Sequence, residues 1–141
     1  MNARRAWRAG SLGATLIILV VRYWLARLFG PPSYAQRAQW LQDACRIVLR
    51  RMGVRLHVIG SSPTQGIVVS NHLGYLDIAA LGAVAPVCFV SKAEVQRWPL
   101  FGTIARAGGT IFLERSNLYS ARQVASRIAE RFADPIPVVI F

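Results

Sequence analysis

The stretch GIVVSNHLGYLDIAALG, residues 66–82, changes from one local pattern to another within a few positions. Its first part, GIVVS, is a short apolar run typical of a buried strand, whereas the part that begins at Asp77 is typical of a short helix. Asn71, His72 and Gly74 lie between them. A strand that leads through a loop into a helix is the repeating unit of α/β folds, so this stretch predicts the fold class.

The same alternation continues along the chain. We expect further strands at residues 54–60, 87–91, 110–114 and 136–141, and further helices at residues 98–109 and 117–133. The prediction is an α/β fold with a largely parallel sheet and flanking helices, preceded by a hydrophobic or amphipathic helical leader. We expect a membrane-anchoring helix at 1–30, an amphipathic helix at 36–53 and the α/β domain at 54–141.

The last residues, from Val138 to Phe141, have the pattern of a buried strand. In α/β sheets the functional loops follow the carboxyl ends of strands, and here the sequence stops where such a loop begins. We therefore expect an incomplete, C-terminally truncated domain that is inactive by itself.

Composition points toward a membrane surface. The chain has 141 residues, is 54% hydrophobic, has a mean hydropathy of +0.37 and carries a net charge of +11. Residues 1–60 hold ten arginines and one acid, a balance of +9, so the basic part is also the apolar part. This combination favours an anionic membrane surface and the cytoplasmic face of the inner (plasma) membrane. It disfavours a nucleic-acid binder, whose basic residues would lie on a polar face.

The apolar run of the leader, residues 12–21, lies between basic residues, with Arg8 before it and Arg22 and Arg27 after it. The run is too short to span a bilayer unless the later arginines snorkel. A cleaved signal peptide and a core helix are the alternatives, but the only cleavage-like motif, Ser33–Ala35, lies far beyond the run. We favour an uncleaved anchor that lies in the interface or dips into the bilayer.

The two cysteines, Cys45 and Cys88, are isolated in apolar segments. They form no CxxC pair and have no histidine at ligand spacing, so the sequence predicts no metal site. Their setting is typical of buried thiols in a reducing compartment. His57 falls on the polar face of the strand expected at 54–60, and we assign it no role.

His72 and Asp77 are the candidate catalytic pair. A spacing of five would place them about 140° apart on one helix, so they meet only if His72 lies in the loop and Asp77 in the first helical turn. Asp77 would then fix the imidazole tautomer, and the other ring nitrogen could take a proton from a hydroxyl. In the alternative interpretation, Asp77 is simply a helix cap and His72 a turn residue.

Four segments in order resemble the glycerolipid acyltransferases, the family of 1-acylglycerol-3-phosphate (lysophosphatidate) acyltransferases. They are the NHxxxxD block at residues 71–77, the connecting segment FVSKAEVQRWPLFG at 89–102, the second block GGTIFLERSN at 108–117 and the strand PVVIF at 137–141. Phe141 matches the first residue of the third block, usually F-P-E-G-T. Each block alone is weak, but four in the expected order are specific.

The resemblance implies acyl transfer from acyl-CoA or acyl-carrier protein to the hydroxyl of a lysophospholipid, with 1-acylglycerol-3-phosphate as the expected acceptor. It implies that His72 is the general base, Asp77 its orienting partner and Arg115 a ligand of the acceptor phosphate. Glu114 and Lys92 are further candidates for substrate binding. Lys92 could equally form a surface pair with Glu94, and Arg115 could instead pair locally with Glu114. Membrane lipids are the implied partners, and no cofactor beyond the thioester is implied.

Two other functions remain open. The acceptor could be a lyso-ornithine lipid or glycerol-3-phosphate, and a non-phosphate acceptor would leave Arg115 with less to bind. The chain could instead be a non-catalytic lipid-binding module.

Overall fold

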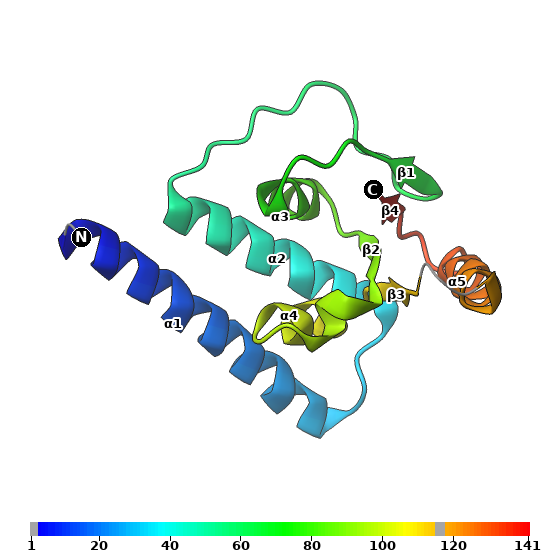
Figure 1. Ribbon diagram of the computed structural model, residues 1–141, viewed down its shortest axis with the longest axis horizontal. Coiled ribbons are helices and arrows are strands. Elements are labelled where there is room, and N and C mark those ends of the chain that lie inside the picture. The colour runs from blue at the N-terminus through cyan, green and yellow to red at the C-terminus, as the bar shows by residue number, and fades with distance from the viewer. Residues whose placement is uncertain (1–2, 115–117) are drawn as a thin grey trace.

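The computed structural model describes residues 3–114 and 118–141. Figure 1 shows their arrangement. The helices are α1 (Ala3–Ala26), α2 (Tyr34–Met52), α3 (Tyr75–Val84), α4 (Phe101–Ala107) and α5 (Leu118–Arg131), with short 3-10 helices η1 (Arg27–Phe29) and η2 (Ala93–Arg97). The strands are β1 (Ile67–Val69), β2 (Cys88–Lys92), β3 (Ile111–Leu113) and β4 (Val138–Ile140).

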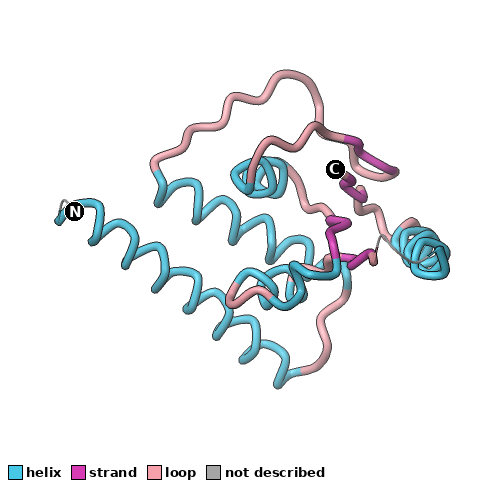
Figure 2. Tube along the Cα trace, in the orientation of Figure 1, coloured by secondary structure: helices cyan, strands magenta, loops and turns pink. Residues whose placement is uncertain are grey.

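The four strands form one parallel sheet in the order β1-β4-β2-β3. Helix α5 connects β3 to β4 on one side of the sheet, and α2 and α3 lie on the other side (Figure 2). This arrangement confirms the predicted α/β class with its parallel sheet and the preceding apolar helix. Because all strands run the same way, the residues that follow their carboxyl ends meet at one edge.

Neighbouring residues of the central strands face opposite layers, as the period of two in a strand requires. Val139 of β4 and Phe89 of β2 join the core beneath α2 and α3. Val138 and Cys88, one position earlier, join the core beneath Val124 of α5. Both faces of the two central strands are therefore covered, which explains their continuous apolar runs. Contrary to the prediction, the edge strand β1 is not buried, since Ile67 and Val69 are 53% and 81% exposed.

Helix α2 holds the ends of two other helices. Gln42 Nε2 donates to the carbonyl of Val84 at 3.0 Å, and Arg46 Nε donates to that of Ala83 at 2.9 Å. Arg37 Nε donates to the carbonyl of Ala107 at 3.0 Å. The last carbonyls of a helix have no partner within it, so these side chains satisfy the ends of α3 and α4.

The prediction of a strand at residues 54–60 is wrong. Val54 packs against the core, but the segment forms no strand, and Val58 and Ile59 are 54% and 89% exposed. Alternating apolar residues form a strand only where another strand offers its backbone, and within the described chain none is paired here. The helix predicted at 98–109 starts only at Phe101, because Leu100 adopts a left-handed φ of 63°.

Both cysteines are free and buried, as expected. Burial raises the pKa of the Cys45 thiol to about 12 and also raises the pKa of Cys88. Both thiols are therefore protonated at neutral pH and act as small apolar side chains.

One face of α1 packs against the domain and the other is exposed. The packed face holds Thr15, Leu19 and Tyr23, which recur every four residues. The segment Gly10–Phe29 is long and apolar enough to cross a membrane, judged by length and composition. Its exposed large apolar residues are Ile17, Ile18, Val21, Trp24, Leu25, Leu28 and Phe29. That this helix anchors the chain stays a prediction.

Close packing at Gly102 gives a test of this fold. A Cβ at this position would lie 2.3 Å from the Gln96 carbonyl oxygen, a backbone atom that cannot swing away. We expect Gly102→Ala to lower the free energy of unfolding by about 1–3 kcal/mol, measured by urea denaturation in detergent. Gly13→Ala is the matched control, because no atom lies within 4 Å of its Cβ position and alanine favours a helix. Equal stability of the two variants would contradict this packing.

Candidate active site

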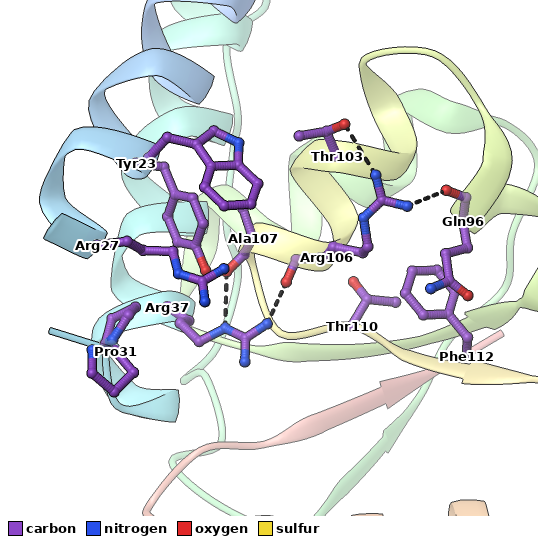
Figure 3. Close-up of a pocket in the computed structure, with 12 residues that line it drawn as sticks. Tyr23, Arg27, Pro31, Arg37, Gln96, Thr103, Arg106, Ala107, Thr110 and Phe112 are labelled. Carbon is purple, nitrogen blue, oxygen red and sulfur yellow. Dashed lines mark hydrogen bonds between the residues drawn. The ribbon is translucent and has the colours of Figure 1, made fainter.

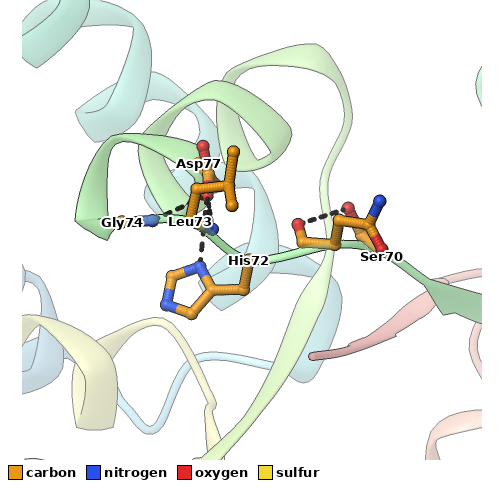
Figure 4. A network of polar contacts seen from close by, with 6 residues as sticks. Ser70, His72, Leu73, Gly74 and Asp77 are labelled. Carbon is orange, nitrogen blue, oxygen red and sulfur yellow. Dashed lines mark hydrogen bonds and ion pairs between the residues drawn. The ribbon is translucent and has the colours of Figure 1, made fainter.

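His72 and Asp77 meet at the turn between β1 and α3. Asp77 is the third residue of α3, and its Oδ2 accepts hydrogen bonds from the backbone N–H of Leu73 at 2.6 Å and of Gly74 at 3.0 Å. His72 Nδ1 lies 3.4 Å from the same oxygen (Figure 4). The loop position of His72 and the first-turn position of Asp77 thus produce the pairing that a single helix could not.

The Asp77 carboxylate is ionised at neutral pH. Its pKa is lowered, chiefly because the N–H of Gly74 and then that of Leu73 donate to it. A negative oxygen opposite Nδ1 favours the tautomer that carries its proton there, which leaves the lone pair on Nε2. In Figure 4 this second nitrogen points away from Asp77. With about a third of each side chain exposed, the ring is open to a substrate hydroxyl.

Phe141 supports the imidazole from the neighbouring strand. Its ring stacks on His72 with centroids 4.4 Å apart and an interplanar angle of 30°, and it also stacks on Phe89 at 5.9 Å. The contact arises because β1 pairs with β4, so their carboxyl ends lie side by side. Sequence reasoning missed this role of Phe141, because no local pattern reveals which strands are neighbours.

The other predicted residues lie along the same edge where the structure describes them. Lys92 ends β2 and is exposed, and Glu114 directly follows β3. Because Lys92 is in register with Leu113, the residue before Glu114, Lys92 and Glu114 lie at the ends of adjacent strands. Glu114 lines a shallow pocket together with Arg127 of α5. Arg115 lies outside the described residues, so its predicted phosphate contact has no structural counterpart here.

Two further questions at this edge are what Ser70 contacts and whether nearby side chains could hold a metal ion. The Ser70 hydroxyl donates to the carbonyl of Asn71 at 3.1 Å, a local contact that does not involve His72 (Figure 4). Within residues 3–114 and 118–141, no group of three His, Cys, Asp or Glu side chains could hold a metal ion. The pair His72–Asp77 is thus the feature of this edge with an evident use in proton transfer.

Comparison with known proteins identifies close relatives. The family model described as Acyltransferase matches residues 53–141. The lyso-ornithine lipid O-acyltransferase of Rhodobacter capsulatus is 38% identical over 81% of this chain and 43% of its own length. That of Pseudomonas aeruginosa is 37% identical over 72% of this chain and 38% of its length. The 1-acyl-sn-glycerol-3-phosphate acyltransferase of Neisseria meningitidis is 32% identical over 72% of this chain and 40% of its length.

No solved structure matches the chain. The chain spans about two fifths of the length of these relatives, whose shares range from 38% to 43%. The family match covers the loop with His72 and Asp77, all four strands, and α3 to α5. The chain therefore belongs to the glycerolipid acyltransferase family.

Proposed function

We propose that this protein transfers an acyl group from a thioester to the free hydroxyl of a lysolipid, with His72 as general base. The observation that carries the proposal is the 3.4 Å contact between His72 Nδ1 and the ionised Asp77 carboxylate at the carboxyl edge of the sheet. The family and the printed names of the relatives support acyl transfer to a lysolipid.

The chemistry needs one base and no covalent enzyme intermediate. Nε2 of His72 takes the proton of the acceptor hydroxyl while its oxygen attacks the thioester carbonyl carbon. The C–S bond of the tetrahedral intermediate then breaks, and the leaving thiolate takes the proton from the imidazolium. Asp77 orients the ring and stabilises its positive charge in between. Acyl-CoA and acyl-carrier protein both supply such a thioester, and the proposal covers either donor.

The relatives favour lyso-ornithine lipid as the acceptor. Four lyso-ornithine lipid O-acyltransferases share 34% to 38% identity with this chain. The second candidate is 1-acylglycerol-3-phosphate, supported by the 32% identical Neisseria enzymes and by the predicted phosphate ligands Arg115 and Lys92. Arginine binds a phosphate in two places at once, a contact that the ornithine acceptor does not need.

A membrane position suits these substrates. We infer that α1 anchors the protein in the membrane, because its exposed side holds Ile17, Val21 and Leu25. The basic residues around its apolar run favour the cytoplasmic face. Its packed side contacts the domain through Leu19 and Tyr23, so the helix suits an interfacial position better than a free span. A lysolipid could then reach the site by lateral diffusion while the polar donor stays in the cytosol.

His72→Ala tests the base. We expect the rate of transfer from labelled acyl-CoA or acyl-carrier protein to fall by about 10²–10⁴-fold, because the acceptor hydroxyl loses its proton acceptor. The assay offers lyso-ornithine lipid and 1-acylglycerol-3-phosphate side by side, so the acceptor is identified at the same time. His57→Ala is the matched control, because His57 is exposed on the loop before β1. Transfer retained in His72→Ala would overturn the base assignment.

Asp77→Asn tests the positioning role. Asparagine can still accept one backbone N–H but carries no charge to stabilise the imidazolium. We expect kcat to fall by about tenfold or more, with little change in KM for the acceptor, since Asp77 acts only through His72. A rise in KM with kcat unchanged would mean that Asp77 shapes the acceptor site instead, and would contradict the proposal.

The anchor is tested by making the exposed face of α1 polar. Ile18, Val21 and Leu25 are each roughly half exposed, so their replacement by Gln leaves the packed face intact. We expect the triple variant to lose co-sedimentation with anionic vesicles, because each side chain would forfeit about 1.5–3 kcal/mol of burial in lipid. The control replaces Leu56, Val58 and Ile59 on the exposed loop. Equal loss in both variants would show that α1 is not a specific anchor.

A further inference from the structure

A second cavity lies apart from the His72 edge, at the junction of α1, α2 and α4. It has a volume of about 360 Å³, within the range of small-ligand sites. Three arginines line it, Arg27 just after α1, Arg37 of α2 and Arg106 of α4, and none of its lining residues is acidic (Figure 3). None of them belongs to the His72–Asp77 cluster, so the mechanism above leaves this cavity unused.

Two of the three guanidinium groups are held in place by backbone. Arg37 donates to the carbonyls of Ala107 and Arg106, and Arg106 Nη1 donates to the carbonyl of Gln96 at 2.7 Å. Arg106 Nη2 also donates to Thr103 Oγ1 at 3.2 Å. A guanidinium has five N–H donors, so both keep donors to spare. Rigid, partly satisfied guanidinium groups make a ready anion site, because little entropy is lost on binding.

Arg27 differs from the other two. Its guanidinium lies 5.0 Å from the ring centroid of Trp24, and among the described residues it makes no hydrogen bond. Hydrogen bonds to the end of α4 account for Arg37, and those to Gln96 and Thr103 account for Arg106, but nothing comparable in the described part of the chain accounts for a third cation beside them. Like charges gathered in one cavity repel each other, and a bound anion removes that cost.

The cavity also lies where lipid headgroups would be. Tyr23 and Trp24 form part of its wall at the end of the apolar helix, and aromatic residues of this kind are typical of the membrane interface. The exposed apolar face of α1 ends here, with Leu25 two positions before Arg27 and Leu28 directly after it. A phosphate at the depth of the headgroups would therefore meet the arginines while its acyl chains follow α1.

We propose that this cavity binds the phosphate ester of an anionic membrane phospholipid, as a site separate from the catalytic edge. The same chemistry would also recognise the phosphates of a soluble donor such as coenzyme A. The position of the cavity at the end of the apolar helix favours the lipid. The site would fix the depth and orientation of the domain on the membrane. It does not depend on acyl transfer or on His72.

The test titrates the full chain, in zwitterionic micelles, with short-chain phosphatidylglycerol and follows tryptophan emission. Trp24 lines the cavity, so the signal should saturate in the wild type and disappear in Trp24→Phe. We expect Arg27→Gln to weaken binding roughly tenfold, the effect of losing one charge-assisted contact. Arg22→Gln is the matched control, because Arg22 is an exposed arginine near the end of α1 that does not line the cavity. It should change the affinity by about twofold or less.

Three results would overturn the proposal. These are a titration that does not saturate, equal weakening in Arg22→Gln and Arg27→Gln, or saturation by coenzyme A or inorganic phosphate with no response to the lipid. The last result would assign the cavity to a soluble phosphate. Circular dichroism shows that each variant is folded, and His72→Ala should bind the lipid as the wild type does. Failure of the proposed acyl transfer would thus leave this titration unchanged.

Discussion

The structure depends on the way in which side chains of α2 close the ends of α3 and α4. Gln42 and Arg46 satisfy the last carbonyls of α3, and Arg37 does the same for α4. Gly82 and Gly108 permit this closeness, since a Cβ at either would lie 2.8 Å from a side-chain atom of α2. A polar contact between helices needs close approach, and close approach needs a residue without a side chain. Helix α2 therefore fixes the connection from α3 into β2 and the connection from α4 into β3.

The position of α3 in turn determines the candidate active site. With the C-terminus of α3 held by α2, its first turn lies beside the end of β1, and Asp77 can accept from Leu73 and Gly74 while it faces His72. One carboxylate thus shapes the turn and orients the imidazole. Asp77 contributes this stability above its ordinary pKa, and the contribution is lost as the pH falls through the lowered folded value. The turn is therefore intact across the neutral range in which acyl transfer would occur.

Local patterns were enough to predict the fold class and the strands β1 to β4, and together with the family resemblance they predicted the contact of His72 with Asp77. They were enough because each depends on residues close in sequence: a buried run of apolar residues, or a loop that turns within five positions. The false strand at 54–60 and the missed stacking of Phe141 on His72 have the opposite origin. Both depend on which strands become neighbours, and the order β1-β4-β2-β3 is set by long-range packing that no local spacing encodes.

Arg37 connects the end of α4 with the cavity at the end of α1. Its Nε and Nη2 donate to the last carbonyls of α4, and the same side chain lines the cavity beside Arg27 at the end of α1. Helix α4 is connected through residues 98–100 and η2 to β2, whose last residue, Lys92, lies at the same sheet edge as His72. A phosphate held between α1 and α4 would therefore bear on elements that lead to that edge. On this view the anchor sets how the catalytic edge faces the membrane as well as keeping the protein near its lipid substrate, because α1, α2 and α4 share one charged junction.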